Sequence, residues 1–438
     1  MATRGPTCSL ACATLRDSSL AFDGVEAAAV TDTCHSGAKA AGRRRSTSLH
    51  RRRRLWLRVH RWLGLVAGAL LVVISLSGSA LVYLKEIDAW LNPRLLRVDP
   101  PENGMAAYRS MSELVAAAQA ASPADARLGF AYYPRQANEA LVFYASGKRE
   151  DGRRADTTNI YVNPYTGQVT GTRLYDGGDS LLHGSAIAFL FKLHPSLLLG
   201  STGSSIVGGL GLLFILSMLT GLILWWPITG KWRLGFLTKG HASAVRVNHD
   251  LHWLIGFYAL PLLLAVLVSG VYLNLGAQFR WIVERFSPLT PLPNLRATAP
   301  AGGAAISIEQ ALDSVRHAFP DGRLDTFSLP SLGKGIYPYA LSQRVPAGCC
   351  FVGRRTILLD RYSGKIMQLG DPFQGSGGDL FIQWQLPVHC GYAFGELGRI
   401  MIFLAGIGCT LLYATGVLRW LQKRRARSRA AIRLAGTT

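Results

Sequence analysis

The chain has 438 residues, of which 49% are hydrophobic and 17% charged, and its formal net charge is +21. Its length alone would allow two or three soluble domains, but four apolar runs that lack Asp, Glu, Lys and Arg argue against a soluble protein. The runs are Leu63–Leu84, Ile206–Trp226, Leu254–Phe279 and Ile400–Leu418. As helices, they are each about long enough to cross a hydrocarbon core of roughly 30 Å. We therefore expect a membrane protein with a bundle of four transmembrane helices.

The apolar runs divide the chain into membrane and aqueous segments. Residues 1–50 mix small, polar and basic residues without an apolar core, so we expect a disordered cytoplasmic tail there. The transmembrane helices are expected at 55–87, 204–227, 251–279 and 396–421. The aqueous segments are then the long connections 90–193 and 280–388, the short loop 228–250 and the tail 422–438.

The two long connections share one predicted order of elements. The first has a helix over 110–122 with Ser112 as its N-cap, strands over Ala140–Ala145 and Thr158–Val162, and a turn at Asn163–Gly167. The second has a helix over Ser307–Ala318, strands over Tyr337–Gln343 and Arg355–Leu359, and a turn at Asp360–Gly364. We therefore expect two α+β modules in a chain that is internally duplicated.

The clusters of basic residues beside the predicted membrane helices lie on one side of the predicted membrane. They precede the first helix, fill the loop between the second and third, and follow the fourth: Arg51–Arg54 and Arg58, then Lys231, Arg233, Lys239 and Arg246, then Lys423–Arg425, Arg427 and Arg429. The positive-inside rule predicts that these segments, and so both termini, are cytoplasmic. Because the clusters lie at membrane ends, they do not indicate a nucleic-acid partner.

Four histidines recur in register between the two halves. His60 and His252 lie 192 residues apart, and Gly64 and Gly256 follow them by four residues; the Ser-Gly pairs Ser77-Gly78 and Ser269-Gly270 complete this pattern. His194 and His389 lie 195 residues apart, and each is followed by two spaced glycines and then by the Thr-Gly pairs Thr220-Gly221 and Thr415-Gly416. Duplication explains why apolar residues recur, but it does not require all four histidines to be retained.

The predicted topology brings these histidines together in pairs. His60 and His252 open helices that run outward, so both lie at the cytoplasmic edge, whereas His194 and His389 precede helices that run inward and lie at the outer edge. Two imidazoles on facing helices are the axial ligands that a haem iron in electron transfer needs. We therefore expect two haem groups, one for each pair.

The glycines of the repeat fit a flat cofactor. Gly64 and Gly256 lie one helical turn after a histidine, and Gly78 and Gly270 lie about five turns after it, near the opposite pair. Contact between helices is the alternative role for each glycine.

Other ligands and other metals stay open at this point. His249 is the rival of His252, and His183 is the rival of His194. Interfacial histidines can also merely anchor a helix end, and two histidines are too few for a closed structural zinc site.

The chain resembles the PepSY-associated transmembrane family. The resemblance rests on His60-Arg-Trp-Leu-Gly64, on Leu193-His-Pro with Gly200 and Gly203, on Asp250-Leu-His252, and on Val388-His-Cys-Gly391 with Gly395 and Gly398. The turns Asn163–Gly167 and Asp360–Gly364 resemble the ends of PepSY modules, and the likeness covers about residues 55–425. Because the family includes iron-regulated inner-membrane proteins and siderophore reductases, the resemblance implies haem b, the bacterial inner membrane and two periplasmic modules.

Together with the histidine pairs, the resemblance implies a ferric-siderophore reductase of the inner membrane. Electrons would pass from a cytoplasmic or quinol donor to periplasmic Fe(III), and reduction would release the iron because hard oxygen donors hold Fe(II) less well. No flavin or nicotinamide fingerprint appears, so the donor is a separate molecule. Two alternatives remain: a non-enzymatic PepSY protein that binds or regulates a peptidase or another partner, and an electron-transfer subunit for a different periplasmic oxidoreductase.

Overall fold

The computed structural model describes residues 51–147, 156–177, 184–226, 243–291, 304–329, 339–344, 354–371 and 374–435. The predicted tail 1–50 and His183 lie outside these ranges. The chain divides into two compact units, Met1–Val59 and His60–Thr438. The second unit holds all the elements discussed below except the first residues of the helix that begins at Arg51.

Three described helices are long and apolar enough to cross a membrane. They are Arg51–Val82, which includes η2 (Leu63–Ala67) and α2 (Gly68–Val82), then α7 (Gly200–Trp225), and the run Tyr392–Ala435, which includes η5 (Tyr392–Phe394) and α13 (Gly395–Ala435). The pair α8 (Ala244–Tyr258) and α9 (Leu260–Asn274) passes the same test but is bent by 59°. The described residues therefore provide three spans, or four if the bent pair is one span.

The bend corrects the expectation of one continuous helix over 251–279. Pro261 stands in the first turn of α9 and has no N–H to donate, so it cannot continue the hydrogen bonds of α8. A second break at Leu275 separates α9 from α10 (Gly276–Val283). The expected loop 228–250 is also too long, because α8 already begins at Ala244.

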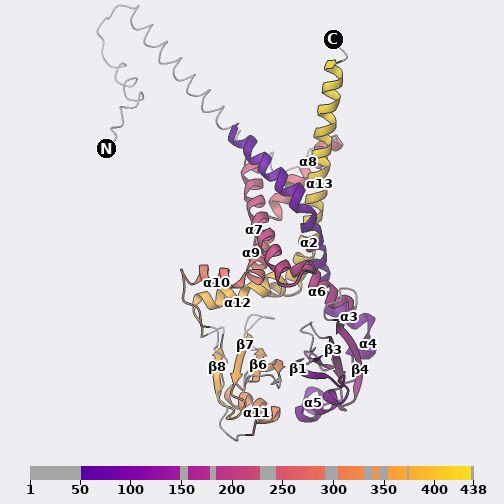
Figure 1. Ribbon diagram of the computed structural model, residues 1–438, viewed down its shortest axis with the longest axis vertical. Helices are drawn as coiled ribbons and strands as arrows, with labels where there is room; N and C mark the ends of the chain where they lie inside the picture. The colour runs from indigo at the N-terminus through magenta and orange to yellow at the C-terminus, as the bar shows by residue number, and fades with distance from the viewer. Residues whose placement is uncertain are drawn as a thin grey trace, which may run out of the picture. The chain divides into compact units, whose positions relative to one another are not determined.

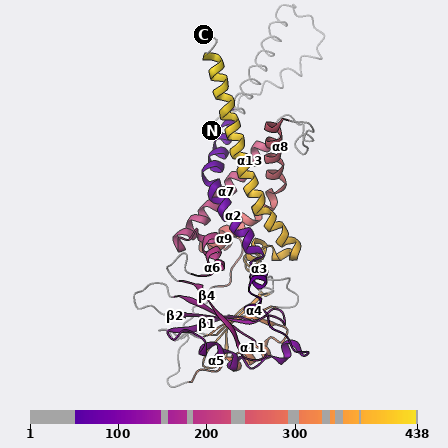
Figure 2. The same ribbon diagram turned by 90° about the vertical axis from the view of Figure 1, so that its right-hand side faces the viewer.

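The long helices pack in pairs, α2 along α13 and α7 along α9 (Figures 1 and 2). Gly406 of α13 allows the closest approach between α2 and α13. A Cβ on Gly406 would lie 2.0 Å from Ser79 Oγ and 2.6 Å from the carbonyl oxygen of Ser75, so only glycine fits there. Small residues are typical of helix contacts inside membranes, where the backbones must approach closely.

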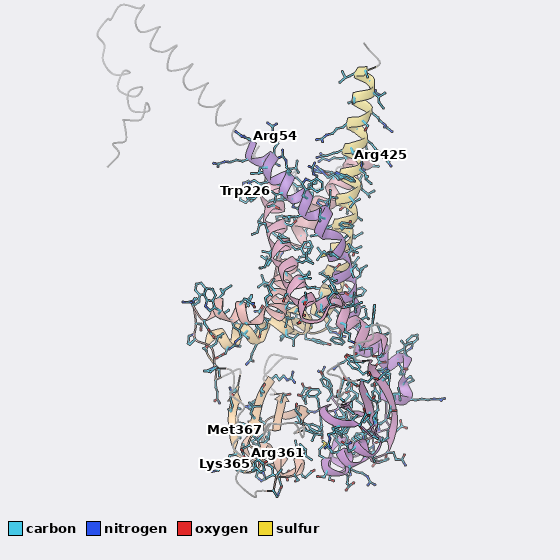
Figure 3. The ribbon with its side chains drawn as sticks, viewed as in Figure 1. Arg54, Trp226, Arg361, Lys365, Met367 and Arg425 are labelled. Atoms are coloured by element: carbon cyan, nitrogen blue, oxygen red, sulfur yellow. The ribbon has the colours of Figure 1, made fainter. Side chains whose placement is uncertain are left out.

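Large apolar side chains cover the outside of these helices. Val66, Leu213 and Leu404 are 68%, 42% and 55% exposed. Figure 3 labels Trp226 and Arg425 at the ends of α7 and α13 that lie away from α6 (Ala186–Ser196) and α12 (Gly377–His389). An apolar surface that ends in tryptophan and arginine is typical of helices in a bilayer.

All eight described strands form one antiparallel sheet, in the order β4-β3-β2-β1-β5-β6-β7-β8. The strands are β1 (Ala126–Tyr132), β2 (Leu141–Gly147), β3 (Thr157–Val162), β4 (Val169–Asp176), β5 (Arg323–Ser328), β6 (Tyr339–Arg344), β7 (Arg354–Leu359) and β8 (Ile366–Gly370). The two expected modules are therefore halves of one sheet, joined where Ala131 of β1 pairs with Phe327 of β5.

One face of the sheet carries the hydrophobic core. The helices α5 (Met111–Ala120) and α11 (Ile308–Ala318) cover this face, and side chains from both halves of the chain meet beneath them. Phe143 and Phe327 are fully buried, and their ring centroids lie 6.1 Å apart. Each half thus completes the core of the other.

The two predicted turns are confirmed and have the same construction. Asn163 Oδ1 accepts hydrogen bonds from the main-chain N–H of Tyr165 and Thr166, and Asp360 Oδ1 accepts them from Tyr362 and Ser363. The N–H groups, that of Ser363 first, hold the pKa of Asp360 below its ordinary value.

Several predicted boundaries are wrong. The N-cap of α5 is Ser110, because its side chain accepts from the N–H of Glu113, and Ser112 already lies inside the helix. The segments 90–193 and 280–388 contain α6 and α12, which pack on the membrane helices α2 and α9. The tail 422–438 is helical as far as Ala435, because α13 continues beyond its apolar part.

The remaining helices connect the spans to the sheet. They are α3 (Leu84–Leu91), α4 (Pro93–Leu96) and η3 (Gly104–Ala107). Arg173 of β4 donates to both carboxylate oxygens of Asp88 on α3, at 2.7 and 2.8 Å, and Lys192 of α6 forms an ion pair with Asp176 of β4. The outer sheet is therefore tied through β4 to two helices that contact the membrane spans.

We predict that Gly406→Leu lowers the thermal stability of the purified protein. The new side chain has no room beside Ser79 and would force α2 and α13 apart, which we expect to cost about 1–3 kcal/mol. The matched control is Gly209→Leu in α7, because nothing lies within 4 Å of a Cβ at that position. Equal melting temperatures for the two variants in detergent would contradict the α2–α13 packing.

Candidate functional site

The four repeated histidines form two pairs of imidazole rings. His60 and His252 of α8 have ring centroids 6.3 Å apart with an angle of 75° between the ring planes; we call this the first pair. His194 of α6 and His389 of α12 have centroids 6.0 Å apart at 49°; we call this the second pair. Each pair takes one histidine from each half of the chain, so neither half contains a complete pair.

The two pairs lie at opposite ends of the helices. Gly78 is 18 residues after His60 in the same helical run and lies against the ring of His194. At 1.5 Å per residue, the two histidines are separated by about 27 Å along that helix. This separation is close to the thickness of a hydrocarbon core.

Both rings of the first pair are held by a neighbouring helix. The Nδ1 atom of His60 lies 2.9 Å from the carbonyl oxygen of Ser217 and 3.2 Å from Thr220 Oγ1, both on α7. The Nδ1 atom of His252 lies 3.1 Å from the carbonyl oxygen of Leu412 and 2.9 Å from Thr415 Oγ1, both on α13. The two anchors are equivalent positions of the repeat.

The second pair has the same kind of anchor. His194 Nδ1 lies 2.8 Å from the carbonyl oxygen of Ile74 on α2, with Ser77 Oγ at 3.5 Å. His389 Nδ1 lies 3.1 Å from the carbonyl oxygen of Val266 on α9, with Ser269 Oγ also at 3.1 Å. Serine thus replaces threonine at this end, and the carbonyl acceptor is retained.

The anchors determine which ring nitrogen carries the proton. A carbonyl oxygen can only accept a hydrogen bond, so each Nδ1 must be the donor, and in the neutral ring Nε2 keeps its lone pair. No described residue forms a hydrogen bond with Nε2 of any of the four histidines. Histidines that bind metals commonly donate their other N–H to a carbonyl in this way. Each pair can therefore offer two Nε2 atoms to one metal ion.

A glycine lies against each of the four rings. A Cβ on Gly78, Gly221, Gly270 or Gly416 would lie 2.6, 3.1, 3.2 or 3.5 Å from Cε1 of His194, His60, His389 or His252, respectively. In every case the carbonyl anchor is four residues before the glycine and the hydroxyl is one residue before it. A side chain at the glycine would displace the ring from its anchor.

The sequence identified only two of these four glycines. Gly78 and Gly270 were predicted as site residues, whereas Gly221 and Gly416 were noted only as parts of Thr-Gly pairs. The signal was present, because Thr-Gly and Ser-Gly are the same hydroxyl-glycine pair in two repeats. In contrast, nothing lies within 4 Å of a Cβ on Gly64, and a Cβ on Gly256 would meet only Leu412, at 3.7 Å. Neither of these two predicted glycines lies against a histidine ring.

The rival ligands do not join the pairs in the described part of the chain. His249 Nδ1 lies 3.0 Å from Asp250 Oδ1, and its ring packs on Trp253 with centroids 5.4 Å apart. His183 lies outside the described residues. Among the residues that the structure describes, no group of three or more His, Cys, Asp or Glu side chains gathers at one point.

We predict that all four paired histidines are neutral with the proton on Nδ1. The main-chain carbonyl at each Nδ1 requires a proton on that nitrogen, since protonation at Nε2 alone would set two acceptors against each other, and only the neutral ring leaves the Nε2 lone pair free for a metal. Solid-state ¹⁵N NMR of protein labelled at histidine should show protonated Nδ1 and unprotonated Nε2 for these residues. A spectrum that assigned the proton to Nε2 would contradict the anchoring.

Comparison with known proteins gives the family. Residues 57–423 match the family described as the PepSY-associated TM region. A protein of Pseudomonas aeruginosa, named "Uncharacterized protein PA4219", is 28% identical over 278 residues, which span 57% of this chain and 66% of that relative. The match to the family covers most of the sequence and includes both histidine pairs with their anchors. The chain therefore belongs to the PepSY-associated transmembrane family, as its motifs predicted.

Proposed function

We propose that the protein is a haem b protein of the bacterial inner membrane that carries electrons across the bilayer and reduces ferric siderophores on the periplasmic side. The observation that supports this proposal is the pairing of four anchored imidazoles, with two free Nε2 atoms near each surface of the membrane. A scaffold that only presented outer modules to a partner would not need these four rings in matched orientations.

The spacing of each pair fits an iron between two imidazoles. Two metal–nitrogen bonds of about 2 Å each, with about 1.1 Å from each nitrogen to its ring centre, require centroids roughly 6 Å apart. The observed separations are 6.3 and 6.0 Å. The remaining ligands of such an iron would come from the porphyrin, which agrees with the absence of a third protein ligand among the described residues.

His60 and His252 would hold one haem, and His194 and His389 the other. When bound, a haem with two imidazole ligands supplies one-electron transfer. The chain's own contribution is orientation: the carbonyl and hydroxyl anchors fix each ring, and the adjacent glycine leaves room for it. Rings that are already held need little rearrangement when the iron changes its charge.

Electrons would leave the protein from the haem that the second pair would hold. α6 carries His194, and its Lys192 forms an ion pair with Asp176 of β4, so this pair is linked to the outer sheet. The basic segments Arg51–Arg54 and Lys423–Arg425 favour a cytoplasmic location for the opposite end. An electron that reaches Fe(III) in a siderophore converts it to Fe(II), which oxygen donors hold less tightly.

Not every arginine of the outer sheet is free to bind an anionic chelate. Arg355 is 7% exposed and donates to Asp321 and to Asp371, each at 3.0 Å. Its charge is therefore neutralised within the protein. Arg361 lies at the turn between β7 and β8 and remains available for steering (Figure 3).

We predict two b haems per chain and the loss of about one haem on replacing any one of His60, His194, His252 or His389 by Ala. The two histidines of a pair would be the two axial ligands of one iron, so one substitution removes one of these two ligands. The pyridine-haemochrome assay on purified protein measures this number. His317→Ala is the control, because this histidine lies on α11 and bonds the main chain of its own helix.

A pair of glycine variants separates haem binding from helix packing. Gly78→Ala brings a Cβ to 2.6 Å from the ring of His194, whereas Gly64→Ala meets nothing within 4 Å. The first variant should lose haem from the second pair and the other should retain both. Protein that contained no haem after expression with added haem would contradict the proposal and favour a non-enzymatic, partner-binding role.

We predict that Fe(III)-siderophore reoxidises the chemically reduced protein. The second pair should pass its electron to the chelate, so the Soret band of the oxidised form returns and Fe(II) appears, trapped by a ferrous chelator. Substitution of His194 should slow this step at least about tenfold, because it removes a ligand of the exit site. A protein that contains haem but is not reoxidised by ferric siderophores would instead serve another periplasmic oxidoreductase.

A further inference from the structure

A cluster of polar and aromatic side chains on α8 lies one helical turn before His252 and has no role in the anchors. Asp250 is 6% exposed and accepts from Arg246 at 2.9 Å and from His249 Nδ1 at 3.0 Å. The imidazole of His249 packs on Trp253 at 5.4 Å between centroids, with 34° between the planes. A buried ionisable group in a membrane protein commonly marks a functional site.

This cluster is absent from the other half of the duplicated chain. At the positions 192 residues earlier stand Leu57, Arg58 and Arg61 in place of His249, Asp250 and Trp253. The duplicated scaffold and the ligand pairs therefore do not require it. One end of the molecule carries a feature that serves only the second half.

The orientation of His249 gives it one free basic nitrogen. Nδ1 donates to the carboxylate of Asp250, so the lone pair is on Nε2. No described residue bonds to Nε2, and the side chain is 27% exposed. Arg246 balances the charge of Asp250, and the carboxylate can therefore keep the imidazole oriented.

Apolar side chains and aromatic rings lie beside the cluster. Val245, Val247 and Leu251 of α8 are 57%, 51% and 42% exposed, so this helix presents an apolar surface beside the cluster. The ring of Trp253 lies beside that of Trp225 on α7, with centroids 6.2 Å apart. The ring of Trp225 is in turn stacked on Phe257, with centroids 4.1 Å apart. A lipid-soluble ring compound can reach such a surface and pack on an indole.

We propose that His249, Asp250 and Trp253 form a site where a membrane quinol is oxidised, and that the first pair receives its electrons there. The inference rests on the proposed function and names its electron donor. A donor protein would deliver electrons alone and would need no base, whereas a quinol must lose a proton with each electron. The juxtaposition of a free imidazole nitrogen, an apolar helix surface and the adjacent ligand His252 fits a quinol.

The chemistry balances with the ferric chelate as the terminal acceptor. One quinol loses two electrons and two protons and becomes the quinone. The protons leave the two hydroxyl groups one at a time to Nε2 of His249 and pass from it to water. The first pair would hold the haem that takes up the electrons one at a time, and the second pair would hold the haem that passes them on, so that two Fe(III) chelates are reduced to Fe(II). Along α8, His249 and His252 are separated by only about 4.5 Å of helix rise.

The test compares two reductants on the haem-loaded protein in nanodiscs. Decylubiquinol should reduce the haem of the wild type, and His249→Gln should slow this reduction at least about tenfold, because glutamine cannot accept the proton. Dithionite should reduce both proteins at the same rate and both should contain the same amount of haem. His317→Gln is the matched control and should behave as the wild type.

A binding measurement makes the result independent of electron transfer. An azido derivative of decylubiquinone should label the peptide that contains Trp253, and Trp253→Leu should weaken this labelling severalfold. Trp281→Leu, at an exposed tryptophan of α10, should leave it unchanged.

The two proposals fail in different ways. Equal quinol rates in wild type and His249→Gln, or labelling confined to another segment, would overturn the quinol site. Dithionite-reduced protein that is reoxidised by ferric siderophore but never reduced by quinol would also overturn it, while the reductase proposal would stand. Absence of haem would overturn the reductase proposal and, with it, quinol oxidation at this site.

Discussion

The contact between each histidine Nδ1–H and a main-chain carbonyl of a neighbouring helix is the constraint on which the two sites depend. It fixes the protonated nitrogen and leaves Nε2 of each ring with its lone pair, while the two ring centroids of the first pair lie 6.3 Å apart. The carbonyl belongs to the residue four positions before a glycine, so the acceptor and the space for the ring come from one helical turn. A change at the glycine and a change at the histidine would thus act on the same contact.

The two halves of the chain are interdependent at every level. Each half anchors its own two histidines: His60 on α7 and His194 on α2 in the first half, and His252 on α13 and His389 on α9 in the second. The pairs form only between halves, and the sheet is likewise joined through β1 and β5. A gene duplication would explain this arrangement, since two copies of one helix–module–helix unit can complete each other's sites.

The sequence was most informative about features that only a few residue types can form. The four histidines, their spacing and the two Asx turns could be read directly, because a ligand or a tight turn tolerates few replacements. The strands β1 and β5 were missed: Arg323–Ser328 has no clear alternation of apolar residues, and in Ala126–Tyr132 the alternation is interrupted by Ala131. Their pairing joins segments almost 200 residues apart, which local patterns cannot indicate.

The local geometry around the sites could be predicted only in part. A four-residue spacing suggested Gly64 and Gly256, but the π-helical segment Leu63–Ala67 follows His60, and the glycines that touch the rings come from other helices. The bend at Pro261 was also overlooked in a run that appeared uniformly apolar. The sequence offers His249 as a rival ligand, whereas in the structure its Nδ1 atom lies 3.0 Å from Asp250 Oδ1.

The central claim is that two imidazoles from different halves of the chain share one iron at each end of the membrane helices. Electron paramagnetic resonance of the oxidised, purified protein tests it most directly, because six-coordinate iron with two imidazole ligands is low-spin. The account predicts two low-spin ferric signals, one of which disappears when His60 or His252 is replaced and the other when His194 or His389 is replaced. A high-spin spectrum in the unmodified protein, or a single signal that any one of the four substitutions removes, would contradict it.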